Sequence, residues 1–183
     1  MPVTAGRPSM AEWRNENVPP STEYELRRNV ATAPGTVREE DSARILIRSN
    51  DDPAGEYYEP IGEDERGRFE QRCRELGVGV MDATKENIAY GPGVGRYPPQ
   101  IRIPKTAGYL AHAHELDHAE MDAKNGSPGI AYYLEHPEAR VEIEEHAYGL
   151  EIERAESDGY TDLAMRLRKL LDEEVSRIER ESQ

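Results

Sequence analysis

The sequence has few of the residues that build disulfides and large aromatic cores. It contains one cysteine, one tryptophan and one phenylalanine among 183 residues. The lone thiol, Cys73, excludes an intramolecular disulfide and any cysteine-only zinc site. No run approaches the roughly 18 apolar residues of a membrane span, and the N-terminus has neither the basic nor the apolar region of a Sec signal peptide. We therefore expect no membrane partner, and a protein that is cytoplasmic or is delivered by a non-Sec route.

Basic residues are also scarce. The chain has 23 Lys and Arg against 37 Asp and Glu, which gives a net charge of -14. Nucleic-acid binding depends on clustered basic side chains that neutralise phosphates, so a nucleic-acid partner is disfavoured. The sequence is 36% hydrophobic and 33% charged, which leaves little apolar material for a core unless it is concentrated in one part of the chain. One domain of ordinary size with a solvated segment fits this composition.

The composition changes near residue 60. Residues 1–60 are rich in Pro, Asn, Ser, Thr and charge, and only Ala43–Arg48 is typical of a strand. So little apolar surface does not offset the entropy of ordering the chain. We predict a flexible or loosely docked N-terminal extension over residues 1–60 and a domain over residues 61–183. The alternative that the first segment is an ordered part wrapped around the core stays open.

Hydrophobic periodicity and breaker residues predict a mainly helical α+β domain. The expected helices cover Glu63–Leu76, Ala107–Lys124, Pro137–Ser157 and Thr161–Glu179, and the expected strands cover Val78–Met81, Asn87–Tyr90 and Gln100–Ile103. The strands are short and precede the second helix. We therefore expect a small sheet packed against that helix.

All five histidines lie between positions 112 and 146. His114 and His118 are the two ends of an H-E-x-x-H pattern on a predicted helix, where residues four apart share one face and can bind one Zn²⁺. Glu115 follows the first ligand directly, a position typical of the base that activates water at such a metal. His112 lies on another face of the helix, so we favour a structural or supporting role for it.

A third ligand must come from the acidic helix that follows. Glu144 is the first choice, because the small Ala147 one turn later allows this helix to approach the His114/His118 helix closely. Tyr148 shares about the same face and is a candidate to support the site. Glu145 remains the alternative third ligand, and His146 is an alternative to either glutamate, although a partly buried structural role fits it at least as well.

The segments LAHAHELDHAEMD (110–122) and YYLEHPEARVEIEEHAYGLEIE (132–153) resemble the zincin-like metallopeptidase toxin domains of bacterial polymorphic toxin systems and mobile elements. The likeness extends over Phe69–Glu156, about half the chain. In that family the H-E-x-x-H helix is followed by Tyr-Tyr, Pro-Glu-x-Arg and Glu-x-x-Ala-Tyr motifs, and all three are present here.

The resemblance implies a gluzincin-type site with His114, His118 and Glu144 on Zn²⁺ and Glu115 as general base. It also implies that Tyr132 or Tyr133 steadies the oxyanion. The expected fold is therefore zincin-like.

The function implied by the resemblance is zinc-dependent hydrolysis of peptide bonds in a protein or peptide substrate, by a toxin or effector protease with an immunity or inhibitor protein as partner. Two alternatives remain. One is a catalytically inactive zincin-like binding protein, which Asp117 favours because zincins prefer uncharged residues between the Glu and the second His. The other is a regulatory metalloprotease that cleaves a repressor.

Overall fold

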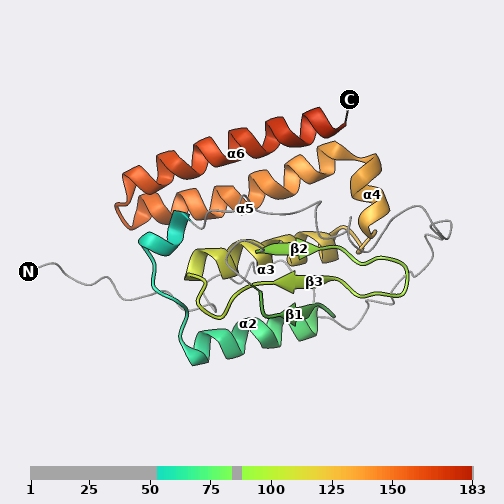
Figure 1. Ribbon diagram of the computed structural model, residues 1–183, viewed down its shortest axis with the longest axis horizontal. Coiled ribbons are helices and arrows are strands. Elements are labelled where there is room, and N and C mark those ends of the chain that lie inside the picture. The colour runs from blue at the N-terminus through green and yellow to red at the C-terminus, as the bar shows by residue number, and fades with distance from the viewer. Residues whose placement is uncertain (1–52, 84–87, 183) are drawn as a thin grey trace, which may run out of the picture.

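The computed structural model describes residues 53–83 and 88–182 (Figure 1). The predicted strand Ala43–Arg48 and most of the predicted extension lie outside the described residues. In chain order the elements are the 3-10 turn η2 (Pro53–Glu56), α2 (Glu63–Glu75), β1 (Gly79–Met81), β2 (Ala89–Gly91), β3 (Gln100–Arg102), α3 (Tyr109–Lys124), α4 (Ile130–Glu135), α5 (Pro137–Ser157) and α6 (Thr161–Glu181).

The predicted α+β class and its four helices are confirmed, and each strand lies within about two residues of its predicted position. Helix α4 was not predicted. It has only six residues, too few for hydrophobic periodicity to show. Its first backbone N–H, on Ile130, donates to the Gly93 carbonyl at 3.1 Å. Gly129, just before it, has φ +83°, and a Cβ there would lie 2.9 Å from the Gly93 oxygen, so this junction requires glycine.

The sheet has the strand order β1-β3-β2, with β3 in the centre. Strand β1 is parallel to β3 and β2 is antiparallel to it. Ile101 on β3 pairs with Val80 on one side and with Tyr90 on the other, and both Ile101 and Tyr90 are fully buried. Because β2 packs on α3 and β1 packs on α2, the two edges of the sheet face different parts of the molecule.

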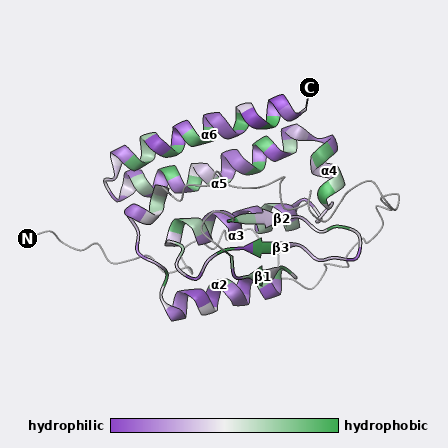
Figure 2. Ribbon diagram, viewed as in Figure 1, coloured by the Kyte–Doolittle hydropathy of each residue, from purple (hydrophilic) through white to green (hydrophobic). Residues whose placement is uncertain are grey.

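The helices form layers on either side of α3 and the sheet. Helix α5 lies between α3 and α6, and α2 lies on the opposite side of the sheet (Figure 1). A turn at Gly159, with φ +82°, reverses the chain between α5 and α6. Figure 2 shows α6 alternating between hydrophobic and hydrophilic residues along its length, as expected for a helix with one solvated face. None of the described helices is long and apolar enough to cross a membrane.

Two hydrophobic cores support these layers. The first joins the sheet to α2, α3, α4 and α5 around Phe69, Ile101 and Ile143. The second joins α5, α6 and the start of α3, and it includes Ala54, which is fully buried. The packed part of the chain therefore begins before residue 61, inside the segment predicted as an extension.

Candidate metal centre

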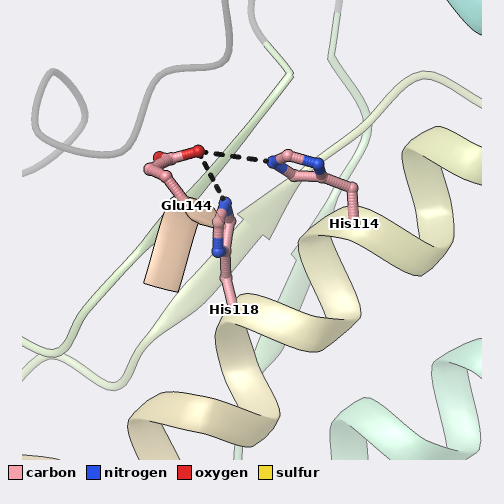
Figure 3. A group of neighbouring side chains, drawn as sticks. All are labelled: His114, His118 and Glu144. Atoms are coloured by element: carbon pink, nitrogen blue, oxygen red, sulfur yellow. Dashed lines mark ion pairs between the residues drawn. The ribbon is translucent and has the colours of Figure 1, made fainter. Parts of the chain in front are cut away.

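Helix α3 directs His114 and His118 toward Glu144 on α5 (Figure 3). The Nε2 atoms of both imidazoles lie 3.7 Å from the same carboxylate oxygen, Oε2 of Glu144. The three side chains are at most 1% exposed. We call these three residues the metal triad. The sequence predicted all three, and the structure brings them together.

The spacing of the metal triad fits a metal ion better than it fits direct hydrogen bonds. A distance of 3.7 Å is longer than the 2.7–3.2 Å of an N–H···O bond. Two ligands that each lie 2.0–2.1 Å from a tetrahedral ion are about 3.4 Å apart, so a shift of a few tenths of an ångström would place all three donors on one ion. The three donor atoms lie within 4.8 Å of one another, and two imidazoles with one carboxylate are a donor set suited to a divalent transition metal.

The surroundings favour an ionised carboxylate at Glu144. Burial disfavours the charge and by itself raises the pKa, but the His118 and His114 imidazoles oppose it, and the net pKa of Glu144 is lowered. An anionic carboxylate is the form that binds a metal ion. Glu144 is therefore expected to stay ionised although it is buried.

Glu151 supports the metal triad from behind His114. The Nδ1–H of His114 donates to Oε2 of Glu151 at 3.1 Å, which leaves Nε2 as the lone-pair nitrogen that faces Glu144. A carboxylate on the far nitrogen of a ligand histidine fixes the tautomer and raises ligand basicity. The Tyr148 ring packs edge-on against the His114 ring at 4.9 Å, consistent with its predicted supporting place.

The sequence pattern did not single out Glu151. The signal that could have found it is its spacing of seven residues from Glu144, two helical turns along the same face. Glu151 is 1% exposed, whereas Glu145, the alternative third ligand, lies on the exposed side of α5. The structure therefore brings Glu144, and not Glu145, close enough to the two histidines to hold an ion with them.

Glu115 and Asp117 occupy other faces of α3. Glu115 directly follows the first ligand and is fully buried. Asp117 accepts a hydrogen bond from Nδ1 of His146 on α5 at 2.8 Å. Burial raises the pKa of Asp117, and His146 opposes that shift. Asp117, the residue that departs from the zincin preference, thus forms a second contact between α3 and α5.

The two tyrosines of α4 occupy different surroundings. The Tyr133 hydroxyl donates to Oδ1 of Asp122 at 2.7 Å, and the Tyr90 hydroxyl donates to Oδ2 of the same carboxylate at 2.7 Å. Tyr132 is 37% exposed and its ring lies against His136, with centroids 4.4 Å apart. The Tyr133 hydroxyl is therefore hydrogen-bonded to Asp122, which lies one turn beyond His118 on α3.

His112 is structural in this fold. Its Nδ1–H donates to the Gly108 carbonyl at 3.0 Å, and its ring packs edge-on against Phe69 with centroids 4.9 Å apart. These contacts tie the first turn of α3 to α2. The side chain packs toward α2, on a different face from His114, as its spacing in the sequence predicted.

The described residues thus form an α+β protein in which a buried cluster of two histidines and one glutamate lies close enough to hold a metal ion. Comparison with protein-family models, with curated proteins and with solved structures returned no match.

Proposed function

We propose that this protein is a zinc-dependent metallopeptidase of the zincin-like class, with Zn²⁺ held by His114, His118 and Glu144. The observation that carries the proposal is the metal triad itself, with both imidazole Nε2 atoms 3.7 Å from one Glu144 oxygen. Glu151 adds support, because its bond to His114 is of the kind that accompanies ligand histidines.

The donor count favours catalysis. Catalytic zinc sites have three protein ligands and keep a further position for water or substrate, whereas structural sites are closed by four. All five histidines and the only cysteine belong to the described residues, and His112, His136 and His146 have other hydrogen-bond partners. Among the described residues, the cluster of side chains close enough to hold an ion has only three members, His114, His118 and Glu144.

In this proposal the side chains divide the chemistry. Zn²⁺ when bound supplies a Lewis acid that lowers the pKa of a coordinated water to about 7 and polarises the scissile carbonyl. Glu115 accepts the proton of the attacking water and passes it to the leaving amine. Glu151 holds His114 in the tautomer that binds the metal, and Glu144 partly neutralises the ion.

A second candidate is a metal-binding protein without peptidase activity. It is favoured by burial, because the metal triad is at most 1% exposed and Glu115 is fully buried. A peptidase of this design has to admit a peptide to these residues, whereas a structural metal requires no such access.

Zinc content per chain tests the part that both candidates share. We expect about one zinc in the purified wild type and loss of zinc in His114→Ala and Glu144→Ala. Glu145→Ala is the matched control, because this exposed neighbour on α5 should retain the metal. A wild type without zinc under metal-replete conditions would overturn the site.

Peptide hydrolysis separates the two candidates. We expect the wild type to cleave members of a mixed peptide library, read by mass spectrometry, and Glu115→Gln to bind zinc while losing at least about 100-fold in rate. Glu145→Gln should cleave as the wild type does. If the wild type and both variants bind zinc but cleave no peptide, the binding protein without peptidase activity is favoured. If Glu115→Gln cleaves as fast as the wild type, Glu115 is not the general base.

The toxin or effector role rests on the family resemblance alone. Growth arrest on expression, relieved by either His114→Ala or Glu115→Gln, is the expected result for a toxin protease. Harmless expression of an active peptidase would favour the regulatory alternative instead.

A further inference from the structure

Tyr90 on β2 contacts two residues that lie one turn apart on α3. Its hydroxyl donates to Oδ2 of Asp122 at 2.7 Å. Its ring lies against the ring of His118, with centroids 6.5 Å apart and planes tilted by 40°, a separation within the range of aromatic pairs. Asp122 follows His118 by four residues, so the two side chains share one side of the helix. Strand β2, which packs on this helix (Figure 1), thus places one tyrosine against both residues.

The carboxylate of Asp122 is held through both of its oxygens. Oδ1 accepts from the Tyr133 hydroxyl at 2.7 Å, while Oδ2 accepts from Tyr90. Asp122 is 1% exposed and both tyrosines are fully buried. Burial and the Asp122 charge raise the pKa of both hydroxyls, so both stay protonated and donate at neutral pH. Because a buried polar group that loses its partner is costly, these three side chains hold one another in a fixed arrangement.

The two histidines of the metal triad are supported differently. The Nδ1–H of His114 donates to Glu151 at 3.1 Å, and the Tyr148 ring packs edge-on against the same imidazole. The ring of His118 lies edge-on to the ring of His114, with centroids 4.5 Å apart, and against the ring of Tyr90. A ligand side chain keeps its geometry when packing holds its rotamer. Tyr90 therefore stands beside His118 as Tyr148 stands beside His114.

We propose that Tyr90 and Asp122 are positioning residues of the metal site: the Asp122 carboxylate fixes the Tyr90 ring, and this ring holds the His118 imidazole with Nε2 toward Glu144. The inference rests on the proposed metal site and adds a support on the side of His118. Because Asp122 and His118 belong to one helix, the hydrogen bond fixes the tyrosine relative to the helix that carries the ligand. Tyr133 supports the same carboxylate, but its own ring packs on Tyr132, with centroids 5.3 Å apart.

Tyr90→Phe and Tyr133→Phe form a matched pair of variants. Each removes one hydrogen bond of 2.7 Å to Asp122 and keeps a buried ring, but only Tyr90 lies against His118. Competition with a chromophoric chelator, on the full chain, measures zinc affinity independently of peptidase activity. We expect Tyr90→Phe to bind zinc about tenfold more weakly than the wild type, and Tyr133→Phe to stay within about twofold of it. Equal affinities for the two variants would overturn the proposal.

Co²⁺ in place of zinc separates positioning from a loss of stability. The visible absorption of bound Co²⁺ depends on the geometry of its ligands, whereas a lower stability alone leaves the spectrum of the folded protein unchanged. We expect Tyr90→Phe to shift or broaden the bands and Tyr133→Phe to reproduce the wild-type spectrum. Identical spectra for all three proteins would contradict a role of Tyr90 in holding His118.

Asp122→Ala tests the same hydrogen bond from its other end, and it replaces Tyr90→Phe if that variant does not fold. We expect it to weaken zinc binding at least as much as Tyr90→Phe does. The double variant should bind zinc as Asp122→Ala alone does, because both substitutions act through one bond. Losses that multiply independently would show that Asp122 does not act through Tyr90. A wild type that binds no metal would overturn the proposed function together with this inference.

Discussion

Helices α5 and α6 have 21 residues each and lie side by side (Figure 1), but they bury different chemistry. Helix α6 buries Leu163, Ala164, Leu167 and Ile178, with Glu174 as its single buried charge. Helix α5 buries Arg140, Glu144 and Glu151 together with its apolar residues. The comparison separates a helix that holds the fold together from a helix that carries the site.

The difference follows from the number of neighbours. Helix α6 packs on α5 and η2 and keeps one face in solvent, so an ordinary amphipathic pattern is sufficient. Helix α5 is covered by α3 on one side and α6 on the other. Its Glu144 and Glu151 face α3, whereas its Arg140 pairs with Glu181 of α6 at 3.1 Å. Buried carboxylates reduce stability unless they are paired, and those of α5 lie against His114 and His118 of α3.

The largest effect on stability is expected in α6. Leu167 is fully buried in the second core, so Leu167→Ala should lower the free energy of unfolding by about 2–5 kcal/mol. Met165 is 56% exposed on the same helix, and Met165→Ala should change it by less than about 0.5 kcal/mol. Urea unfolding measures both. The folded fraction of Leu167→Ala should retain its zinc. If this variant lost zinc before it unfolded, α6 would contribute to the metal site as well as to the fold.

A smaller effect, on the metal instead of the fold, is expected in α5. Replacing Glu151 by Gln weakens the acceptor for His114 Nδ1–H, so zinc affinity should fall about 10–100-fold, or about 1.4–2.7 kcal/mol. Glu153→Gln is the control, because Glu153 is exposed on the same helix. Competition with a chromophoric chelator measures the affinity. Equal affinities for the two variants would mean that Glu151 does not support the site.

The smallest effect is on the pH dependence of the free energy of unfolding, to which Glu144 on α5 and Glu174 on α6 should contribute with opposite sign. Urea unfolding with chelator present measures it. The pKa of Glu144 is lowered below 4.5 by the imidazoles despite its burial, so its ionised form stabilises the fold above pH 4.5 and that stability is lost as pH falls through the lowered pKa. The pKa of Glu174 is raised above 4.5 by burial, against the opposing Arg177, so stability is present below pH 4.5 and is lost as pH rises through the raised pKa.

Substitution isolates each contribution. Glu144→Gln should remove the loss of folding stability that occurs as pH falls below 4.5. Glu174→Gln should remove the loss of folding stability that occurs as pH rises above 4.5. Because each substitution removes one titrating carboxylate, each change should be confined to the pH range between 4.5 and that group's shifted pKa. The same sign of change in both variants would show that the two carboxylates act as one coupled group.

Much of the fold followed from local patterns. The breakers around α3, the Pro137 that begins α5 and the regular leucines of α6 place these helices to within about two residues. Local patterns did not predict α4, whose position depends on the distant Gly93 carbonyl. They also did not show that Ala54 enters the second core, because its burial depends on α3 and α6.

The site divides in the same way. The spacing of His114 and His118 by itself determined that both histidines lie on one face of one helix, because a helix turns once in 3.6 residues. The choice between Glu144 and Glu145, the carboxylate of Glu151 behind His114, and the commitment of Tyr133 to Asp122 were decided only by the tertiary structure. These contacts join residues on different helices, and the angle at which α3 and α5 pack, which no local pattern contains, sets the side chains that meet.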